Sequence, residues 1–94
     1  MKIGIIQMHL YLPGCTSLKE KRGRIKPLIS RLQKEFNVSV AELDLQDVWM
    51  ESIIGCALLN NDSQLIQRSF EKITRYTQSF YTEIELLENQ SEII

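Results

Sequence analysis

The sequence predicts an α+β fold of the ferredoxin-like type, in which two helices cover one face of a four-stranded antiparallel sheet. Two observations lead to this fold class. The hydrophobic patterns occur in the order strand, helix, strand, strand, helix, strand (βαββαβ). The chain has 94 residues, of which 44% are hydrophobic, so we expect residues 1–94 to form a single domain with one two-layer core.

The first predicted strand covers residues 2–12. In an extended chain successive side chains point to opposite faces, so Ile6, Met8 and Leu10 share one face. A Pro-Gly pair directly after the strand predicts a turn. This strand is therefore expected to have one face against the helices and one open face.

The first predicted helix covers residues 18–35. Ser17 and Glu20 match a capping box, in which a hydroxyl and a carboxylate accept hydrogen bonds from free backbone amides. Pro27 lies inside the helix, opposite its apolar stripe, so we expect a kink rather than a break. Asn37 is suited to the left-handed conformation that often ends a helix.

The remaining elements follow from shorter patterns. Residues 38–45 and 49–59 predict the second and third strands, and the third is apolar on both faces, as is typical of a central strand. Turn and cap residues at 60–63 precede an amphipathic second helix. Residues 83–88 predict a short fourth strand, and residues 89–94 are expected to fray.

Charge is distributed unevenly along the chain, although the net charge is only −1. Between Lys19 and Lys34 there are seven basic residues and one acidic residue, which gives +6. The rest of the chain holds four basic and eleven acidic residues, which gives −7. We therefore predict a polyanion-binding surface on the first helix. Its candidate residues are Lys19, Lys21, Arg22, Arg24 and Lys26.

The basic helix has a second interpretation, namely a solvated face that pairs with acidic surface of this chain or of a partner subunit. The isoelectric point of about 5.8 lies below the values above 9 that are typical of dedicated nucleic-acid domains. Lys21 is placed near the apolar edge, where its stem would cover the core while its ammonium reaches water. Lys19, Arg22 and Lys26 are spaced to follow a phosphate backbone.

The sheet face turned away from the helices is the second candidate site. RNA-recognition domains of similar topology stack bases on aromatic residues of this face, but here only Tyr11 and His9 are placed to stack. A partly apolar open face is more typical of subunit contact, so we predict a homo-oligomer, most simply a dimer. Strand alternation assigns seven residues to this face: Ile3, Ile5, Gln7, His9, Tyr11, Ala41 and Leu43.

Other reactive residues form weaker patterns. His9 is the only histidine, and no nucleophile is spaced to use it. Cys15 precedes a helix N-terminus near cations, which favours a reactive thiol, but an unreactive turn cysteine is the simpler interpretation. Four carboxylates lack the regular ligand spacing of a Ca²⁺ loop, so we predict no metal and no cofactor. These are Glu42, Asp44, Asp47 and Glu51.

Catalysis and membrane insertion are both disfavoured. Acylphosphatases share this fold, but the loop "LPGCTS" lacks their phosphate-binding arginine and glycines. No apolar run approaches the roughly 18 residues that span a bilayer. The apolar start is read as a strand rather than a signal peptide, because no small-residue cleavage site follows it. We therefore predict a cytoplasmic protein that is not an enzyme and does not contact membranes.

Three segments carry a resemblance to a known family. The sequences "LPGCTSLKEKRGRIKPL", "FNVSVAELDLQDVW" and "GCALLNND" resemble the YlxP-like family of small bacterial proteins of unknown function. The resemblance implies a ferredoxin-like fold and a bacterial cytoplasmic setting. Some genes of this family lie among translation and ribosome-maturation genes, which implies RNA or the ribosome as a partner. It implies no activity, cofactor or catalytic residue, and Pro27 departs from the family's uninterrupted first helix.

Two hypotheses follow. The first is a non-catalytic module that binds RNA or a ribonucleoprotein through the basic helix. The alternative is a homo-oligomeric protein-interaction module that uses the open sheet face and binds no nucleic acid.

Overall fold

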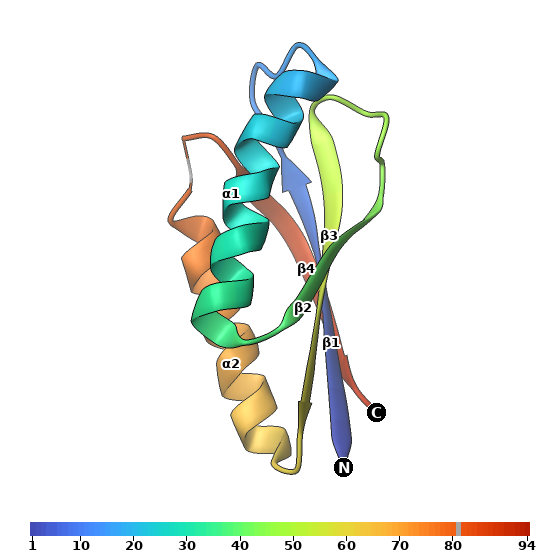
Figure 1. Cartoon of the computed structure of the whole chain (residues 1–94), viewed down its shortest axis with the longest axis vertical. Helices are drawn as coiled ribbons and strands as arrows, with labels where there is room; N and C mark the ends of the chain where they lie inside the picture. Colours follow the sequence, from blue (N-terminus) through green and yellow to red (C-terminus); the bar gives the residue numbers. More distant parts are fainter. Residues whose placement is uncertain (81) are drawn as a thin grey trace.

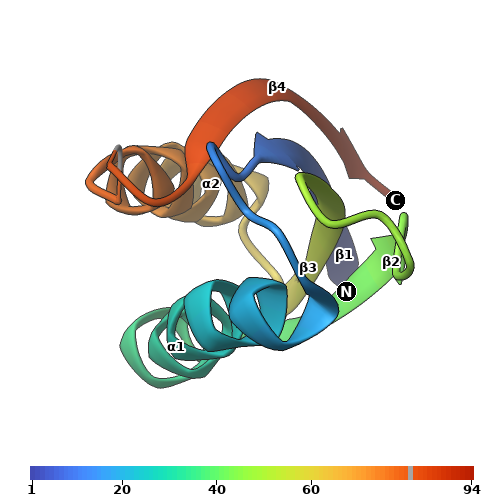
Figure 2. The ribbon, with the colours of Figure 1, turned by 90° about the horizontal axis from the view of Figure 1, so that it is seen from above.

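The computed structural model describes residues 1–80 and 82–94 and confirms the predicted order of elements (Figure 1). The antiparallel sheet has the strand order β2-β3-β1-β4. Both helices cover the same face of the sheet, which makes the fold ferredoxin-like (Figure 2). The elements are β1 (Lys2–Tyr11), α1 (Leu18–Phe36), β2 (Ser39–Asp44), β3 (Glu51–Asn60), α2 (Ser63–Gln78) and β4 (Glu85–Ile93).

The core lies between the sheet and the helices. β1 contributes Ile6, Met8 and Leu10, which are at most 2% exposed, as the strand alternation predicts. The apolar stripe of α1 and that of α2 pack on them, with Leu28 and Ile73 fully buried. Since both stripes are buried on one side of the sheet, the opposite sheet face is left without a covering layer.

The caps of α1 follow the sequence closely. The backbone amide of Glu20 donates to Ser17 Oγ over 3.0 Å, which confirms the N-cap. The Glu20 carboxylate accepts from the amide of Thr16 (2.9 Å), one residue earlier than a capping box requires. The helix continues through Pro27 without interruption and ends at Asn37, which has a left-handed backbone (φ 51°).

Gly4 allows α2 to approach β1 closely. It is buried, and a Cβ atom at this position would overlap side-chain atoms of Ile66 and Phe70. The absence of a side chain therefore determines how deeply α2 lies against the sheet.

Two predicted boundaries were wrong. β3 begins at Glu51, so Trp49 and Met50 belong to the exposed connection after β2. The expected frayed tail at 89–94 is instead the second half of β4, which extends to Ile93 and pairs with β1. Residues 89–92 of this half are all polar, so they lack the alternation that identifies a strand, and only the register against β1 defines it.

No helix in the described part of the chain is both long enough and apolar enough to cross a membrane.

Candidate functional site

The five basic residues proposed to bind polyanions divide into two groups. Lys21 is only 2% exposed, and its Nζ lies 2.6 Å from the carbonyl oxygen of Leu45 and 2.9 Å from Glu42 Oε2. The expectation that its ammonium reaches water was wrong. A lysine at the edge of the apolar stripe turns inward here because β2 supplies a carboxylate and the following connection supplies carbonyl oxygens.

The ammonium of Lys21 stabilises an unusual stretch of backbone. Leu45 has φ 64°, a left-handed conformation that costs about 1–2 kcal/mol outside glycine. The carbonyl oxygen of Leu45 accepts the hydrogen bond from Lys21, and Ser52 Oγ donates to Glu42 Oε2 over 2.6 Å. Ser52 is fully buried, so its hydroxyl is inaccessible to a substrate. The Lys21–Glu42–Ser52 group is therefore a structural network that fixes the β2–β3 connection to α1.

Arg24 also has structural partners. Its NH1 group donates to the carbonyl oxygens of Pro13 (2.7 Å) and Glu83 (3.1 Å), and its NH2 group bonds Glu20 Oε1 (2.8 Å). Hydrogen bonds from Thr16 and Arg24 lower the pKa of Glu20 from its ordinary value of 4.5. Arg24 thus joins the β1–α1 and α2–β4 connections, which lie at the same end of the molecule (Figure 1), and is not free for a ligand.

The basic flank, which we define as Lys19, Arg22 and Lys26, remains exposed at the spacing i, i+3, i+7. Within the described residues none of the three forms an ion pair. Arg22 and Lys26 border a hollow of about 250 Å³ between α1 and β2. Its floor contains Leu18, Ile25 and Ile29.

The open sheet face carries all seven residues that the alternation assigned to it. Ile3 (36%) and Leu43 (48%) are well exposed, and Leu59 (60%), which pairs with Ile3 across β1 and β3, adjoins them. A β-bulge in β2 at Leu43 places that side chain over Gly55 of β3. Sequence reasoning did not identify Leu59 as an exposed apolar residue of this face, because it lies at the end of a strand.

The other reactive groups that the sequence singled out are His9 and the two cysteines. His9 Nε2 lies 2.8 Å from Glu51 Oε1 on the open face. Cys15 is buried, and its Sγ donates to the carbonyl oxygen of Ser17 (3.4 Å); burial raises the pKa of Cys56 to about 11. Across residues 1–80 and 82–94, no three His, Cys, Asp or Glu side chains lie close enough together to hold a metal ion.

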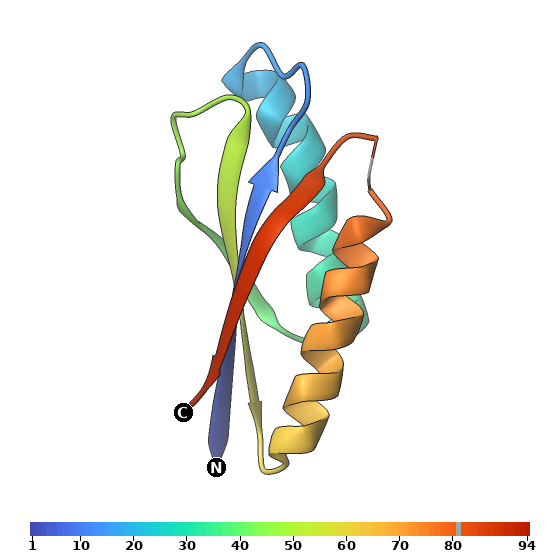
Figure 3. The same ribbon diagram turned by 180° about the vertical axis from the view of Figure 1, so that it is seen from behind.

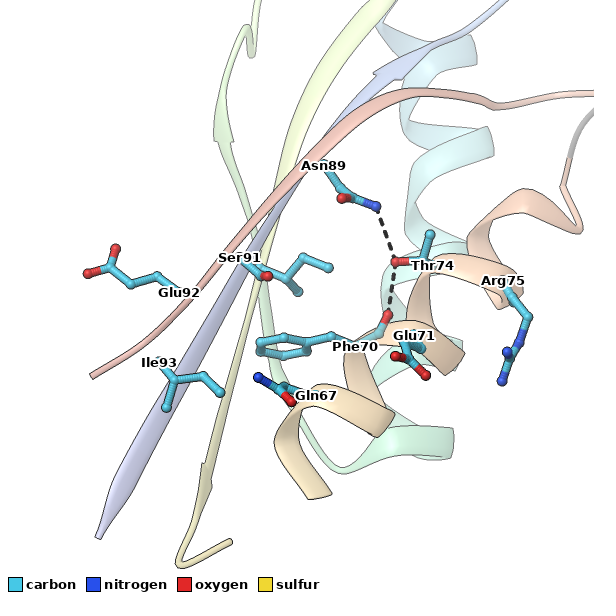
Figure 4. Close-up of a pocket in the computed structure, with 10 residues that line it drawn as sticks. Gln67, Phe70, Glu71, Thr74, Arg75, Asn89, Ser91, Glu92 and Ile93 are labelled. Atoms are coloured by element: carbon cyan, nitrogen blue, oxygen red, sulfur yellow. Dashed lines mark hydrogen bonds between the residues drawn. The ribbon is translucent and has the colours of Figure 1, made fainter. Parts of the chain in front are cut away.

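A larger hollow lies between α2 and β4 and has a volume of about 630 Å³ (Figure 4). We call it the α2–β4 groove. Asn89 and Ser91 of β4 point toward Phe70 and Thr74 of α2, and Asn89 Nδ2 donates to Thr74 Oγ1 over 3.3 Å. The sequence prediction missed this groove because it treated residues 89–94 as a tail.

Comparison with known proteins shows similarity over most of the chain. A family described as protein of unknown function (DUF503) matches residues 3–91. The uncharacterized protein YlxP of Bacillus subtilis (strain 168) is 30% identical over 78 residues, which cover 83% of this chain and 85% of that relative.

Solved structures with similar folds are more distant in sequence. The de novo designed protein Foldit4 has a TM-score of 0.59 at 17% identity, over 98% of this chain and 97% of its own. SnoaB, a cofactor-independent oxygenase from Streptomyces nogalater, has a TM-score of 0.55 at 6% identity, over 99% and 90%. The VAO-type flavoprotein MtVAO713 from Myceliophthora thermophila C1 reaches 0.61 at 9% identity, but this chain spans only 18% of it. These similarities concern the fold alone.

Proposed function

The chain belongs to the DUF503 family of proteins of unknown function, and from this premise we propose that it is a non-catalytic binding module that pairs with a second copy through its open sheet face. The single observation that carries the proposal is the exposed apolar surface formed by β2, β3 and β1. Both helices cover the other face, and no described element covers this one (Figure 3).

The dimensions of the face suit a stable dimer. β1, β2, β3 and β4 have ten, six, ten and nine residues, so with strands spaced by about 4.8 Å and a rise of about 3.3 Å per residue the flat face covers roughly 550 Å². This flat area is of the same order as the roughly 800 Å² that each partner buries in a standard interface. A two-fold pair would place the same apolar residues of both copies against each other.

The distribution of charge supports the same arrangement. The register against β1 places Glu88 and Glu92 on the open face of β4, opposite His9 and Ile5. Because β4 is an edge strand, these carboxylates would lie at the rim of a face-to-face pair, where water still reaches them. Exposed apolar residues with carboxylates at the edge are typical of an ordinary protein interface.

The test is the molar mass in solution, measured by size-exclusion chromatography with light scattering. We expect the wild-type chain to have twice its subunit mass of 11.0 kDa. The cross-strand neighbours Ile3 and Leu59 are both replaced by Glu, which buries charge in the interface and should yield a monomer.

Leu65→Glu provides the matched control, because Leu65 is an equally apolar, exposed residue (40%) on α2, away from the sheet. This variant should remain a dimer. A wild-type chain that is monomeric at 100 μM and above would contradict the proposal, as would a dimer that the Ile3→Glu, Leu59→Glu variant leaves intact.

A second candidate function, RNA binding, is favoured by the basic flank, whose three cations are exposed and lack ion-pair partners in the described chain. With Lys21 and Arg24 bonded internally, the surface has three phosphate contacts rather than five. For single-stranded RNA the slope of log K against log salt should then be about −2, at roughly 0.7 per contact.

Fluorescence anisotropy with single-stranded and structured RNA over a salt series tests this function. Replacing Lys19, Arg22 and Lys26 by Glu should abolish binding. Replacing Lys34, Arg68 and Lys72 by Glu changes the net charge equally at other exposed positions and should preserve most of the affinity. Equal losses of RNA affinity in the two triple variants would mean that only net charge matters, and would reject a specific site on α1.

A further inference from the structure

β4 presents a free backbone edge. It is the last strand in the order β2-β3-β1-β4 and pairs only with β1 in the described chain. Along its nine residues, alternate amide and carbonyl groups therefore point away from the sheet without a strand partner. A segment that binds here must supply backbone donors and acceptors at the spacing of a β-strand.

The α2–β4 groove runs beside this edge. Phe70, Ile6 and Ile93 give it an apolar floor, and Phe70 and Ile6 are almost fully buried. The groove is open because the helix-facing residues of β4 at this level are the small, polar Asn89 and Ser91 (Figure 4). Alternate side chains of an added strand can therefore reach an apolar surface between helix and sheet.

Charge restricts the occupant further. Glu71 and Arg75 of α2 line the groove, and Glu92 of β4 borders it with its side chain turned to the open face (Figure 4). Glu85 and Glu88 of β4 are exposed as well, and none of these four carboxylates forms an ion pair among the described residues. The surroundings of the edge are thus net acidic and complement a basic ligand.

We propose that the α2–β4 groove binds an extended, basic segment of another protein, which adds to β4 as a fifth strand and directs alternate apolar side chains onto Phe70. Main-chain hydrogen bonds provide affinity in this mode, and the groove selects the side chains. The groove is distinct from the apolar surface of the proposed sheet-face dimer, because it opens on the helical side at the sheet edge, and the two sites share only the bordering carboxylates Glu88 and Glu92.

The test begins with selection of phage-displayed random decapeptides on the full-length chain. We expect selected peptides to alternate apolar residues with Lys or Arg. The affinity of labelled peptides is then measured by fluorescence anisotropy for the wild-type chain and for Ser91→Trp. The tryptophan fills the groove from an exposed position, so the peptides should bind this variant at least tenfold more weakly than the wild type. Gln64→Trp introduces the same side chain on α2 at an exposed position that does not line the groove, and should bind normally.

Two further measurements separate strand addition from other binding. N-methylation of every second backbone amide of the peptide retains all side chains but removes hydrogen-bond donors. Two peptides are compared, one methylated at the odd-numbered amides and one at the even-numbered amides. Only the set that faces β4 should reduce the affinity, by at least tenfold. Glu71→Lys should weaken binding several-fold through charge. Circular dichroism spectra and unfolding midpoints verify that each variant is folded.

Three outcomes would overturn the proposal. The first is a selection that yields no peptide sensitive to Ser91→Trp. The second is a set of peptides that keep their affinity whichever of the two alternate sets of backbone amides is N-methylated. The third is self-association that Ser91→Trp abolishes without any peptide, because the edge of β4 would then belong to a second copy of this chain.

Discussion

The α1–β2 interface and the α2–β4 groove occupy equivalent places in the fold, since each lies between a helix and an edge strand. At the first, Lys21 reaches from α1 to Glu42 of β2 and to the backbone beyond it, and a smaller hollow of about 250 Å³ remains beside this ion pair. At the second, Asn89 and Ser91 are too short to fill the space, and a hollow of about 630 Å³ remains. The two sides of one pseudo-symmetric architecture therefore differ: a buried ion pair bridges the α1–β2 side, which we call the closed side, and the wider groove lies on the α2–β4 side, which we call the open side.

The comparison shows that polar residues in an amphipathic pattern have two different roles. A long cation beside an edge strand closes an interface, because its length reaches the backbone of the next connection. Short polar residues on the inner side of an edge strand open a groove. The first role makes a surface look more basic in the sequence than it is, and the second makes a strand look like a tail.

The largest expected effect comes from breaking the closed side. Lys21→Ala leaves Glu42 without its ion partner and the Leu45 carbonyl without its donor, so the free energy of unfolding should fall by about 3 kcal/mol. Urea denaturation monitored by circular dichroism measures the change. Arg22→Ala, one residue along on the exposed side, should change stability by no more than about 0.5 kcal/mol. Similar small effects for both variants would mean that Lys21 does not hold the interface.

A smaller effect is expected where α2 approaches β1. Gly4→Ala introduces a methyl group against Ile66 and Phe70, and overpacking of this kind costs about 2 kcal/mol. Gly23→Ala is the matched control, because no atom lies within 4 Å of its added Cβ and helix propensity should stabilise the chain by about 1 kcal/mol. Opposite signs in thermal unfolding are the expected result; a neutral Gly4→Ala would show that α2 shifts freely.

Filling the open side should stabilise the fold slightly. Ser91→Leu places an apolar side chain over Phe70 and Ile93, and partial burial should add about 0.5–1 kcal/mol to the free energy of unfolding. Gln64→Leu, exposed on α2 and not part of the groove lining, should have no such effect. A destabilised Ser91→Leu variant would indicate that the groove cannot accept an apolar side chain, against the proposed peptide mode.

The smallest effect concerns acid stability at the N-terminus of α1. The pKa of Glu20 is lower in the folded chain than its ordinary value of 4.5, so its contribution is present above that pH and is lost as pH falls through the folded pKa. Thermal unfolding between pH 6 and pH 2.5 should therefore show a shallower acid decline in Glu20→Gln than in the wild type. Identical slopes of unfolding temperature against pH in the two proteins would show that Glu20 does not contribute to the loss of stability in acid.

The parts of the fold that depend on local chemistry could be predicted from the sequence. Ser17 and Asn37 end α1 because each residue type satisfies the backbone groups of a helix terminus. The buried residues of β1 follow from simple alternation. These features depend only on residues a few positions apart in the sequence, so the local sequence pattern is enough to predict them.

The parts that depend on distant contacts could not be predicted in this way. The inward turn of Lys21 requires Glu42 and the left-handed Leu45, which are more than twenty residues away. The second half of β4 is defined by pairing with β1, and its polar composition gave no local signal. The candidate site changed accordingly, from five cations on one helix to three cations and an unpredicted groove.

The buried ammonium of Lys21 also has a consequence for chemical labelling. Acylating reagents and lysine acetyltransferases must reach the amine nitrogen, which here lies among carbonyl and carboxylate oxygens, while Lys19 and Lys26 on the same helix are open to them. An acyl group found on Lys21 would therefore mark a chain that had opened between α1 and β2. The rate of acylation of Lys21, relative to that of Lys19 and Lys26, can thus report how often the chain opens locally between α1 and β2.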